Sequence, residues 1–209
     1  MGSSSSALAR KVSRPGWTDA GGWLETETPC TWAGVGCVDG SVDGLDLAGN
    51  GLSGPIPPEL GSLENLRFLY LWDNALSGPI PPELGDMSSV RRIVLRQNDL
   101  TGVIPPELGG LASLDWLMLN DNRFSGTVPD ALADLEGLDV LWIHENDLEG
   151  PLPLGIAQLG AAIQEEHIAE DCAIRPGNDE LHIPDDDAYR AADLDGDGFI
   201  CGVSVPPGA

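Results

Sequence analysis

Apolar residues recur between Val42 and about Ala161 in a pattern that repeats every 24 residues. In each period, leucines alternate with other residues over a short stretch that an asparagine follows, as in Leu69-Tyr-Leu71-Trp-Asp-Asn74. The asparagines fall at equal spacing, at Asn50, Asn74, Asn98, Asn122 and Asn146. A fixed period in this range predicts a solenoid, in which each unit packs on its neighbours and five units bury one continuous core.

Each unit is expected to contain one short strand and a return segment. Leu69 and Leu71 alternate along the strand and point inward, so the residues between them face solvent. Asn74 turns the chain, and its amide can satisfy backbone groups that a buried turn would otherwise leave unpaired. Gly78 and the prolines after it end the strand and lead into the return segment.

The outward positions of these strands form three columns across the repeats. The first holds Gly44, Phe68, Arg92, Trp116 and Val140. The second holds Asp46, Tyr70, Val94, Met118 and Trp142, and the third holds Ala48, Trp72, Arg96, Asn120 and His144. Because five of the chain's eleven aromatic residues occupy these fifteen positions, we interpret the columns as a binding surface. The alternative is that aromatic residues are there because they favour strands in general.

Basic residues gather on the same surface. Arg67 and Arg91 flank the first column beside Asp115 and Asp139, so four of the chain's ten basic residues lie on one face. Adjacent like charges destabilise a sheet unless something neutralises them, although arginines among carboxylates can also be ordinary surface ion pairs. Exposed Trp, Tyr and Arg dominate binding hot spots. The candidate ligand-binding residues are Phe68, Tyr70, Trp72, Arg92, Arg96, Trp116, Met118, Trp142 and His144.

The chemistry of this face suits two classes of ligand. Aromatic side chains with arginine suit a peptide or protein segment that carries an acidic or aromatic anchor, and they also suit a glycan that stacks on tryptophan. The opposite edge carries Glu59, Glu83 and Glu107, which we interpret as a solvated acidic column.

The segment before the first repeat, residues 15–41, carries a cysteine-bounded motif. It reads Cys30-x-Trp32-x-Gly34-Val35-x-Cys37, and such a loop can cover the open end of the core. With the Leu-x-Gly-x-Ile-Pro phrases at 52–57, 76–81 and, in the third repeat, 100–105, it resembles plant-type leucine-rich repeat proteins. The resemblance implies an α/β-type repeat solenoid, a right-handed superhelix with a parallel concave sheet and a disulfide cap. It also implies an extracellular protein that binds and does not catalyse.

After Ala161 the period stops, and residues 162–171 are expected to form a short helix that closes the core. A second unit, residues 172–203, contains alternating carboxylates followed by a glycine. In an EF-hand-type loop such residues bind calcium, with Gly198 making the sharp turn. The candidate metal ligands are Asp193, Asp195, Asp197 and the carbonyl of Phe199.

This second unit resembles the excalibur domain, a small extracellular calcium-binding module. Residues 193–202 match the ending of that family except at Gly202, where the family has glutamate. The twelfth position of an EF-hand loop that starts at Asp193 is Ser204, so the usual glutamate ligand is absent there too. The expected cofactor is therefore Ca2+, with an acidic turn held by a disulfide as the alternative. Residues 204–209 are a tail.

The four cysteines allow three pairings. We expect Cys30–Cys37 and Cys172–Cys201, because each pair bounds its own small unit. Disulfides favour an oxidising compartment, so an extracellular or cell-surface location is expected, although residues 1–14, a flexible lead-in, show no apolar core of a secretory signal.

The net charge of −24 argues against nucleic acid as a partner, and no apolar run is long enough for a transmembrane segment. Motifs of hydrolases, zinc proteases and phosphate-binding loops are absent, so no enzymatic activity and no catalytic residue are expected. The leading hypothesis is a recognition protein that uses the concave face. The alternatives are a calcium-dependent cell-surface or wall adhesion module that acts through its tail and, more remotely, a hydrolase inhibitor.

Overall fold

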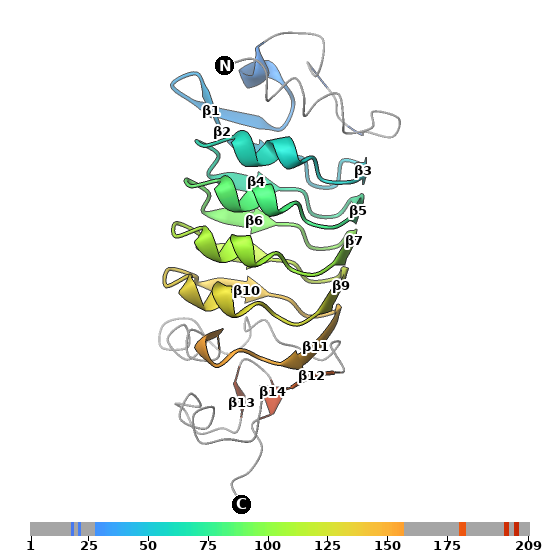
Figure 1. Ribbon diagram of the computed structural model, residues 1–209. Helices are drawn as coiled ribbons and strands as arrows, with labels where there is room; N and C mark the ends of the chain where they lie inside the picture. The colour runs from blue at the N-terminus through green and yellow to red at the C-terminus, as the bar shows by residue number, and fades with distance from the viewer. Residues whose placement is uncertain are drawn as a thin grey trace, which may run out of the picture.

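The computed structural model describes Thr18, Gly21 and residues 28–156, together with the backbone of Glu180–His182, Phe199–Ile200 and Val203–Ser204. The repeats stack one on another, with two sheets along the stack and short helices on one side (Figure 1). Several predictions concern residues outside the described ones: the lead-in, the helix at 162–171, Cys172–Cys201 and the carboxylates Asp193, Asp195 and Asp197.

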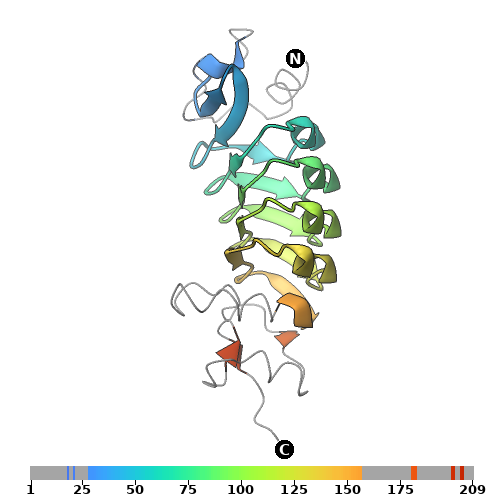
Figure 2. The same ribbon diagram turned by 90° about the vertical axis from the view of Figure 1, so that its left-hand side faces the viewer.

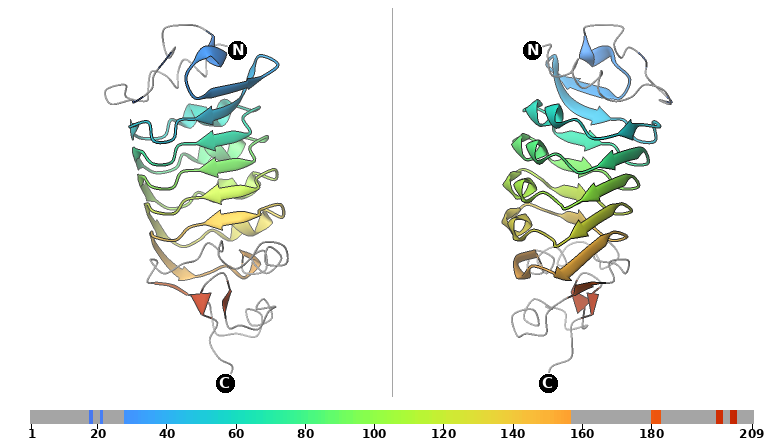
Figure 3. Two further views of the ribbon diagram at one scale, coloured as in Figure 1. Left: turned by 180° about the vertical axis from the view of Figure 1, so that it is seen from behind. Right: turned by 45° about the vertical axis from the view of Figure 1, so that its right-hand side comes forward.

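The first sheet is the one that the leucine pattern predicts. Its strands, in spatial order, are β1 (Val35–Val38), β2 (Ser41–Asp46), β4 (Phe68–Tyr70), β6 (Arg92–Val94), β8 (Trp116–Met118) and β10 (Val140–Trp142). β1 and β2 form an antiparallel hairpin, and every later pair is parallel, with Phe68 opposite Arg92 and Arg92 opposite Trp116. Figure 3 (left) shows β2, β4, β6, β8 and β10 stacked and running in the same direction. The predicted parallel sheet and its columns are confirmed.

A second parallel sheet was not predicted. It consists of β3 (Ser53–Gly54), β5 (Ala75–Gly78), β7 (Asp99–Gly102), β9 (Arg123–Gly126), β11 (Asp147–Pro151) and β12 (Glu180–His182). Gly78, which is expected to end the first strand of its repeat, is instead the last residue of a second strand, β5, and the Leu-x-Gly phrases of the other repeats lie in or beside these short strands. β12 pairs with β11, with Glu149 opposite Glu180, so part of the segment that the sequence assigns to the tail unit extends the sheet of the repeats.

The return segments are 3-10 helices. These are η1 (Pro29–Thr31) in the cap and then η2 (Pro58–Ser62), η3 (Pro82–Asp86), η4 (Pro106–Gly110) and η5 (Asp130–Asp134). Proline begins η1 to η4, where its fixed φ suits a helix start and its missing N–H is not needed. Figure 2 shows η2 to η5 stacked on the side opposite the first sheet. At the far end, β13 (Phe199–Ile200) pairs with β14 (Val203–Ser204) as a small antiparallel hairpin.

The repeat asparagines bond each repeat to the one before it. Asn98 donates to the carbonyl oxygens of Leu71, Leu95 and Arg96 and accepts from the N–H of Leu76, at 3.0 to 3.3 Å. Asn74 and Asn122 make corresponding bonds one repeat earlier and one repeat later. The predicted role of the asparagines in satisfying backbone groups is confirmed, and these three also link two successive repeats.

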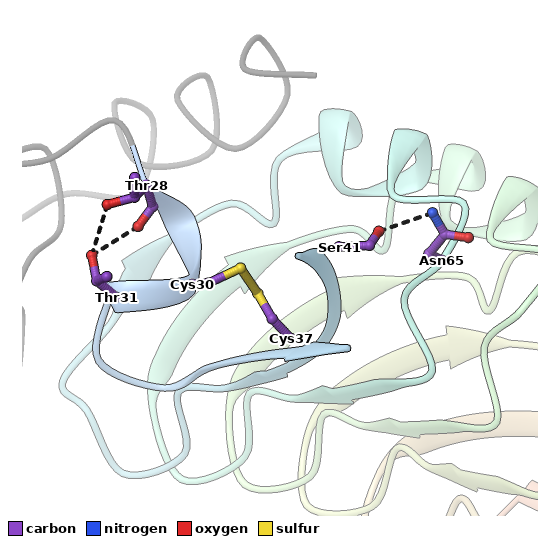
Figure 4. The surroundings of a disulfide bond; sticks show 6 residues. All are labelled: Thr28, Cys30, Thr31, Cys37, Ser41 and Asn65. Atoms are coloured by element: carbon purple, nitrogen blue, oxygen red, sulfur yellow. Dashed lines mark hydrogen bonds between the residues drawn. A yellow bond between two sulfur atoms is a disulfide. The ribbon is translucent and has the colours of Figure 1, made fainter. Parts of the chain in front are cut away.

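The N-terminal cap is a disulfide-bonded hairpin. Cys30 and Cys37 are joined, which confirms the expected pairing, and η1 is supported by hydrogen bonds between Thr28 and Thr31 (Figure 4). Trp32, between the two cysteines in sequence, is 6% exposed and belongs to the core. The cap motif therefore supplies both the covalent bond and the side chain that close this end of the core.

Candidate functional site

The candidate site is the solvent side of the first sheet, here named the aromatic face and defined by the nine predicted residues. The parallel register brings them together from four successive repeats, and the inward leucines that alternate with them, such as Leu69 and Leu117, are fully buried. The predicted residues that are partly exposed are Phe68, Tyr70, Trp72, Arg92, Arg96, Trp116, Trp142 and His144.

Met118 differs from the expectation that it is exposed. It is 8% exposed because it lies in the central column in register between Val94, itself 5% exposed, and the large ring of Trp142. Asn120, in the third column, is 4% exposed. Val94, Met118 and Asn120 therefore form the buried base of the aromatic face, and its exposed part consists of the residues around them.

Arginines lie over the aromatic rings of neighbouring repeats. The guanidinium carbon of Arg92 is 4.0 Å from the ring centroid of Trp116 and 5.7 Å from that of Phe68. Arg96 lies 4.4 Å from the ring centroid of Trp72. We name these five residues the arginine–aromatic stack. Cation–π contacts of this kind are worth about 0.5–1 kcal/mol at exposed sites and more where water is excluded.

Arg67 adds a contact that the sequence did not suggest. Its guanidinium carbon is 5.3 Å from the ring centroid of Phe68. Arg67 precedes Phe68 in the chain, and the sequence placed it only in a flanking column. The signal that could have identified this contact is the direct adjacency of a basic and an aromatic residue at the edge of an outward column.

The arginines of the described part of the chain fall into two groups. Arg91 pairs with Asp115 at 2.6 Å, and Arg123, on the second sheet, pairs with Asp99. The ion pair with Asp115 relieves the repulsion expected between Arg67 and Arg91. Within the described ranges, Arg67, Arg92 and Arg96 have no carboxylate within ion-pair distance. They keep a full positive charge on one face of a chain whose net charge is −24.

The far end of the face is also aromatic. The rings of Trp142 and His144 lie with their centroids 6.0 Å apart, and those of Phe68 and Tyr70 lie 6.2 Å apart at the near end. His144 therefore lies beside an indole ring at the far end of the aromatic face.

The described residues contain neither a cluster of metal-binding side chains nor a membrane-spanning helix. Among them, no group of three or more His, Cys, Asp or Glu side chains is placed to hold a metal ion. The predicted calcium ligands lie outside this part of the chain, apart from the backbone of Phe199. Within the same part, no helix combines the length and the apolar character that crossing a bilayer requires.

Comparison with known proteins gives the family. The Leucine Rich Repeat family matches residues 41–63, 65–87, 89–111 and 113–135. The crystal structure of the BIR2 ectodomain from Arabidopsis thaliana superposes with a TM-score of 0.71 at 31% identity, covering 83% of this chain and 90% of that one. The chain belongs to the leucine-rich repeat family. Its matched segments coincide with the first four of the five repeats that the asparagines define.

Two further leucine-rich repeat proteins place this chain near plant members of the family. "Leucine-rich repeat protein 1" of Oryza sativa subsp. indica is 42% identical over 73 residues, which is 34% of each chain. The ectodomain of the Arabidopsis thaliana membrane receptor kinase GASSHO1/SCHENGEN3, solved in complex with CASPARIAN STRIP INTEGRITY FACTOR 2, has a TM-score of 0.54 at 42% identity, covering 56% of this chain and 14% of that one. The matches span about a third or less of the length of the curated relatives.

Proposed function

We propose that this leucine-rich repeat protein is a non-enzymatic, extracellular recognition protein that binds a peptide or protein segment on the aromatic face. The observation that carries the proposal is the arginine–aromatic stack, which holds two arginines without carboxylate partners on one face of a strongly acidic chain. Tryptophan, tyrosine and arginine are the residues that contribute most to binding at protein interfaces.

The relatives support this proposal. BIR2 is represented by an ectodomain, and GASSHO1/SCHENGEN3 by an ectodomain in complex with another factor. The Cys30–Cys37 disulfide is of the kind that persists in oxidising compartments, which favours an extracellular location. A glycan is less favoured than a peptide, because Trp72 and Trp116 each have an arginine over the ring face on which a sugar would stack.

The test of this proposal is peptide selection on the full chain with variants of the aromatic face. Peptides selected from a random display library should lose at least about tenfold in affinity when Trp116→Ala and Arg96→Glu are combined, because a central aromatic and a cation are removed from the contact surface. Affinity is measured by biolayer interferometry.

The matched control is Arg123→Glu, which makes the same charge change on the second sheet. Equal loss in the control variant would show that only net charge matters, and unchanged binding in the face variant would favour the tail as the functional part. Circular dichroism of each variant shows that its fold is retained.

We also propose that the tail unit binds calcium through Asp193, Asp195 and Asp197. The proposal rests on the spacing of the carboxylates and of Gly198 in the sequence. Calcium should raise the thermal midpoint of the full chain relative to chelator, since an ion that binds only the folded state stabilises it. Asp195→Asn should remove most of that rise, whereas Asp130→Asn, an exposed aspartate of η5, should retain it. A midpoint that does not respond to calcium would contradict the proposal.

A further inference from the structure

The spacing and surroundings of Arg92 and Arg96 narrow the ligand class, on the basis of the function proposed above. We infer that the aromatic face recognises an extended acidic segment in which two carboxylate side chains are separated by three residues, one carboxylate on Arg92 and the other on Arg96.

The spacing follows from the first sheet. Arg92 begins β6, and the parallel hydrogen bonds continue beyond the strand, since Leu95 N–H donates to the Met118 carbonyl and Gln97 N–H to that of Asn120. The backbone is thus extended from Arg92 to Arg96, which places their Cα atoms about 13 Å apart with both side chains on the same side. Arg92 leans toward Trp116 of the following repeat and Arg96 toward Trp72 of the preceding one, so the ligand crosses the strand at an angle. An extended ligand presents its own side chains i and i+4 on one side at the same separation.

The side chains of β6 and β8 that lie between the two arginines are apolar and buried, so they do not project from the sheet. Val94 lies midway between them and is 5% exposed, and Met118, opposite it in register, is 8% exposed. A segment that crosses this point can lie close to the sheet, with a small or β-branched side chain at its central position. A bulky central side chain would lift both carboxylates away from the arginines.

The two guanidinium groups are held before any ligand binds. Each lies against an indole ring, and Arg96 also donates a hydrogen bond to the Gln97 side chain. The Nε of Arg92 is buried without a hydrogen-bond partner, so the donors that remain for a ligand are its two terminal nitrogens. A planar group held in this way loses less rotamer entropy on binding a carboxylate.

Charge favours the same class of ligand. Arg91 and Arg123 are neutralised by ion pairs, whereas Arg92 and Arg96 contact rings and no carboxylate among the described residues. Of the carboxylates beside this face, Asp115 is neutralised by Arg91, whereas Asp46 lies two repeats away from the pair Arg92 and Arg96. Carboxylate–guanidinium bonds can be bidentate and are about twice as strong as neutral hydrogen bonds.

The test uses three blocked pentapeptides with the full-length protein. The probe is Glu-Val-Thr-Val-Glu. Its isomer Glu-Val-Glu-Val-Thr has the same charge at shorter spacing, and Gln-Val-Thr-Val-Gln has the same shape without charge. Binding is measured by tryptophan fluorescence and by NMR titration. We expect the probe to bind about tenfold more tightly than the isomer, which loses one charged contact, and by a larger factor than the uncharged peptide, which loses both.

Variants then locate the contacts. Arg92→Gln and Arg96→Gln should each lower the affinity for the probe to about that of the isomer, whereas Arg123→Gln on the second sheet should leave it unchanged. Equal binding of probe and isomer, or equal loss in Arg123→Gln, would overturn the inference.

The outcomes separate this inference from the proposed function. If library-selected peptides lose affinity on Trp116→Ala but carry no acidic pair, the aromatic face binds peptides and the inference about carboxylates is wrong. If the probe does not bind, the inference is also wrong, and the selection experiment judges the proposed function independently.

Discussion

Gly34→Ala is expected to destabilise the protein by about 3–5 kcal/mol. Gly34 has φ +75°, a conformation that costs an L-residue energy, and a Cβ added there would lie 2.1 Å from the backbone oxygen of Asp46. That oxygen belongs to β2, and the Asp46 N–H donates to the Gly34 carbonyl at 2.7 Å. Moving either Gly34 or Asp46 to make room would break this hydrogen bond between the cap and β2, the first strand of the repeats. Urea denaturation gives the free energy of unfolding.

Gly40→Ala is the matched control. Gly40 has nearly the same φ, +77°, at the turn between β1 and β2, but an added Cβ meets nothing within 4 Å. Its expected cost is only that of the left-handed conformation, about 1 kcal/mol. If both substitutions cost the same, the close approach of Gly34 to β2 contributes nothing.

Asn98→Ala is expected to lower the free energy of unfolding by about 3 kcal/mol or more. The amide bonds with Leu71, Leu95 and Arg96 carbonyls and the Leu76 N–H, and the substitution leaves backbone groups in two repeats without these partners. A buried group that loses its hydrogen bond costs about 1–3 kcal/mol. Urea denaturation measures the change.

The comparison variant is Asn65→Ala. Asn65 is exposed and donates one hydrogen bond, to the hydroxyl of Ser41 (Figure 4). Water replaces that bond, so the expected change is below about 0.5 kcal/mol. A similar small effect at Asn98 would mean that water reaches the freed backbone groups between the repeats.

Much of the fold can be predicted from the repeat. Inward leucines and turn asparagines give the first sheet, its parallel order and the register of its columns, because a fixed period leaves little choice of alignment. The second sheet was not predictable in the same way. Its strands β3, β5, β7 and β9 are two to four residues long. The glycine and serine within them give none of the apolar alternation that identifies a strand.

The candidate site was predictable as a set of positions but not as a set of contacts. The columns place Phe68, Arg92 and Trp116 side by side. Which ring an arginine covers depends on side-chain conformation, and the burial of Met118 depends on the size of Trp142 in the next repeat. Sequence spacing fixes neither of these.

The asparagine bonds also bear on how such a chain can change in evolution. Asn74, Asn98, Asn122 and Asn146 each donate to the carbonyl of a residue 27 positions earlier and accept from an N–H 22 positions earlier. Every junction between repeats therefore has the same chemistry, so duplication or loss of one 24-residue unit recreates a junction that already exists. A ligand-binding surface that spans the columns can therefore be lengthened by whole 24-residue units. Insertion or deletion of a single residue would instead break the spacing on which the asparagine bonds of that junction depend.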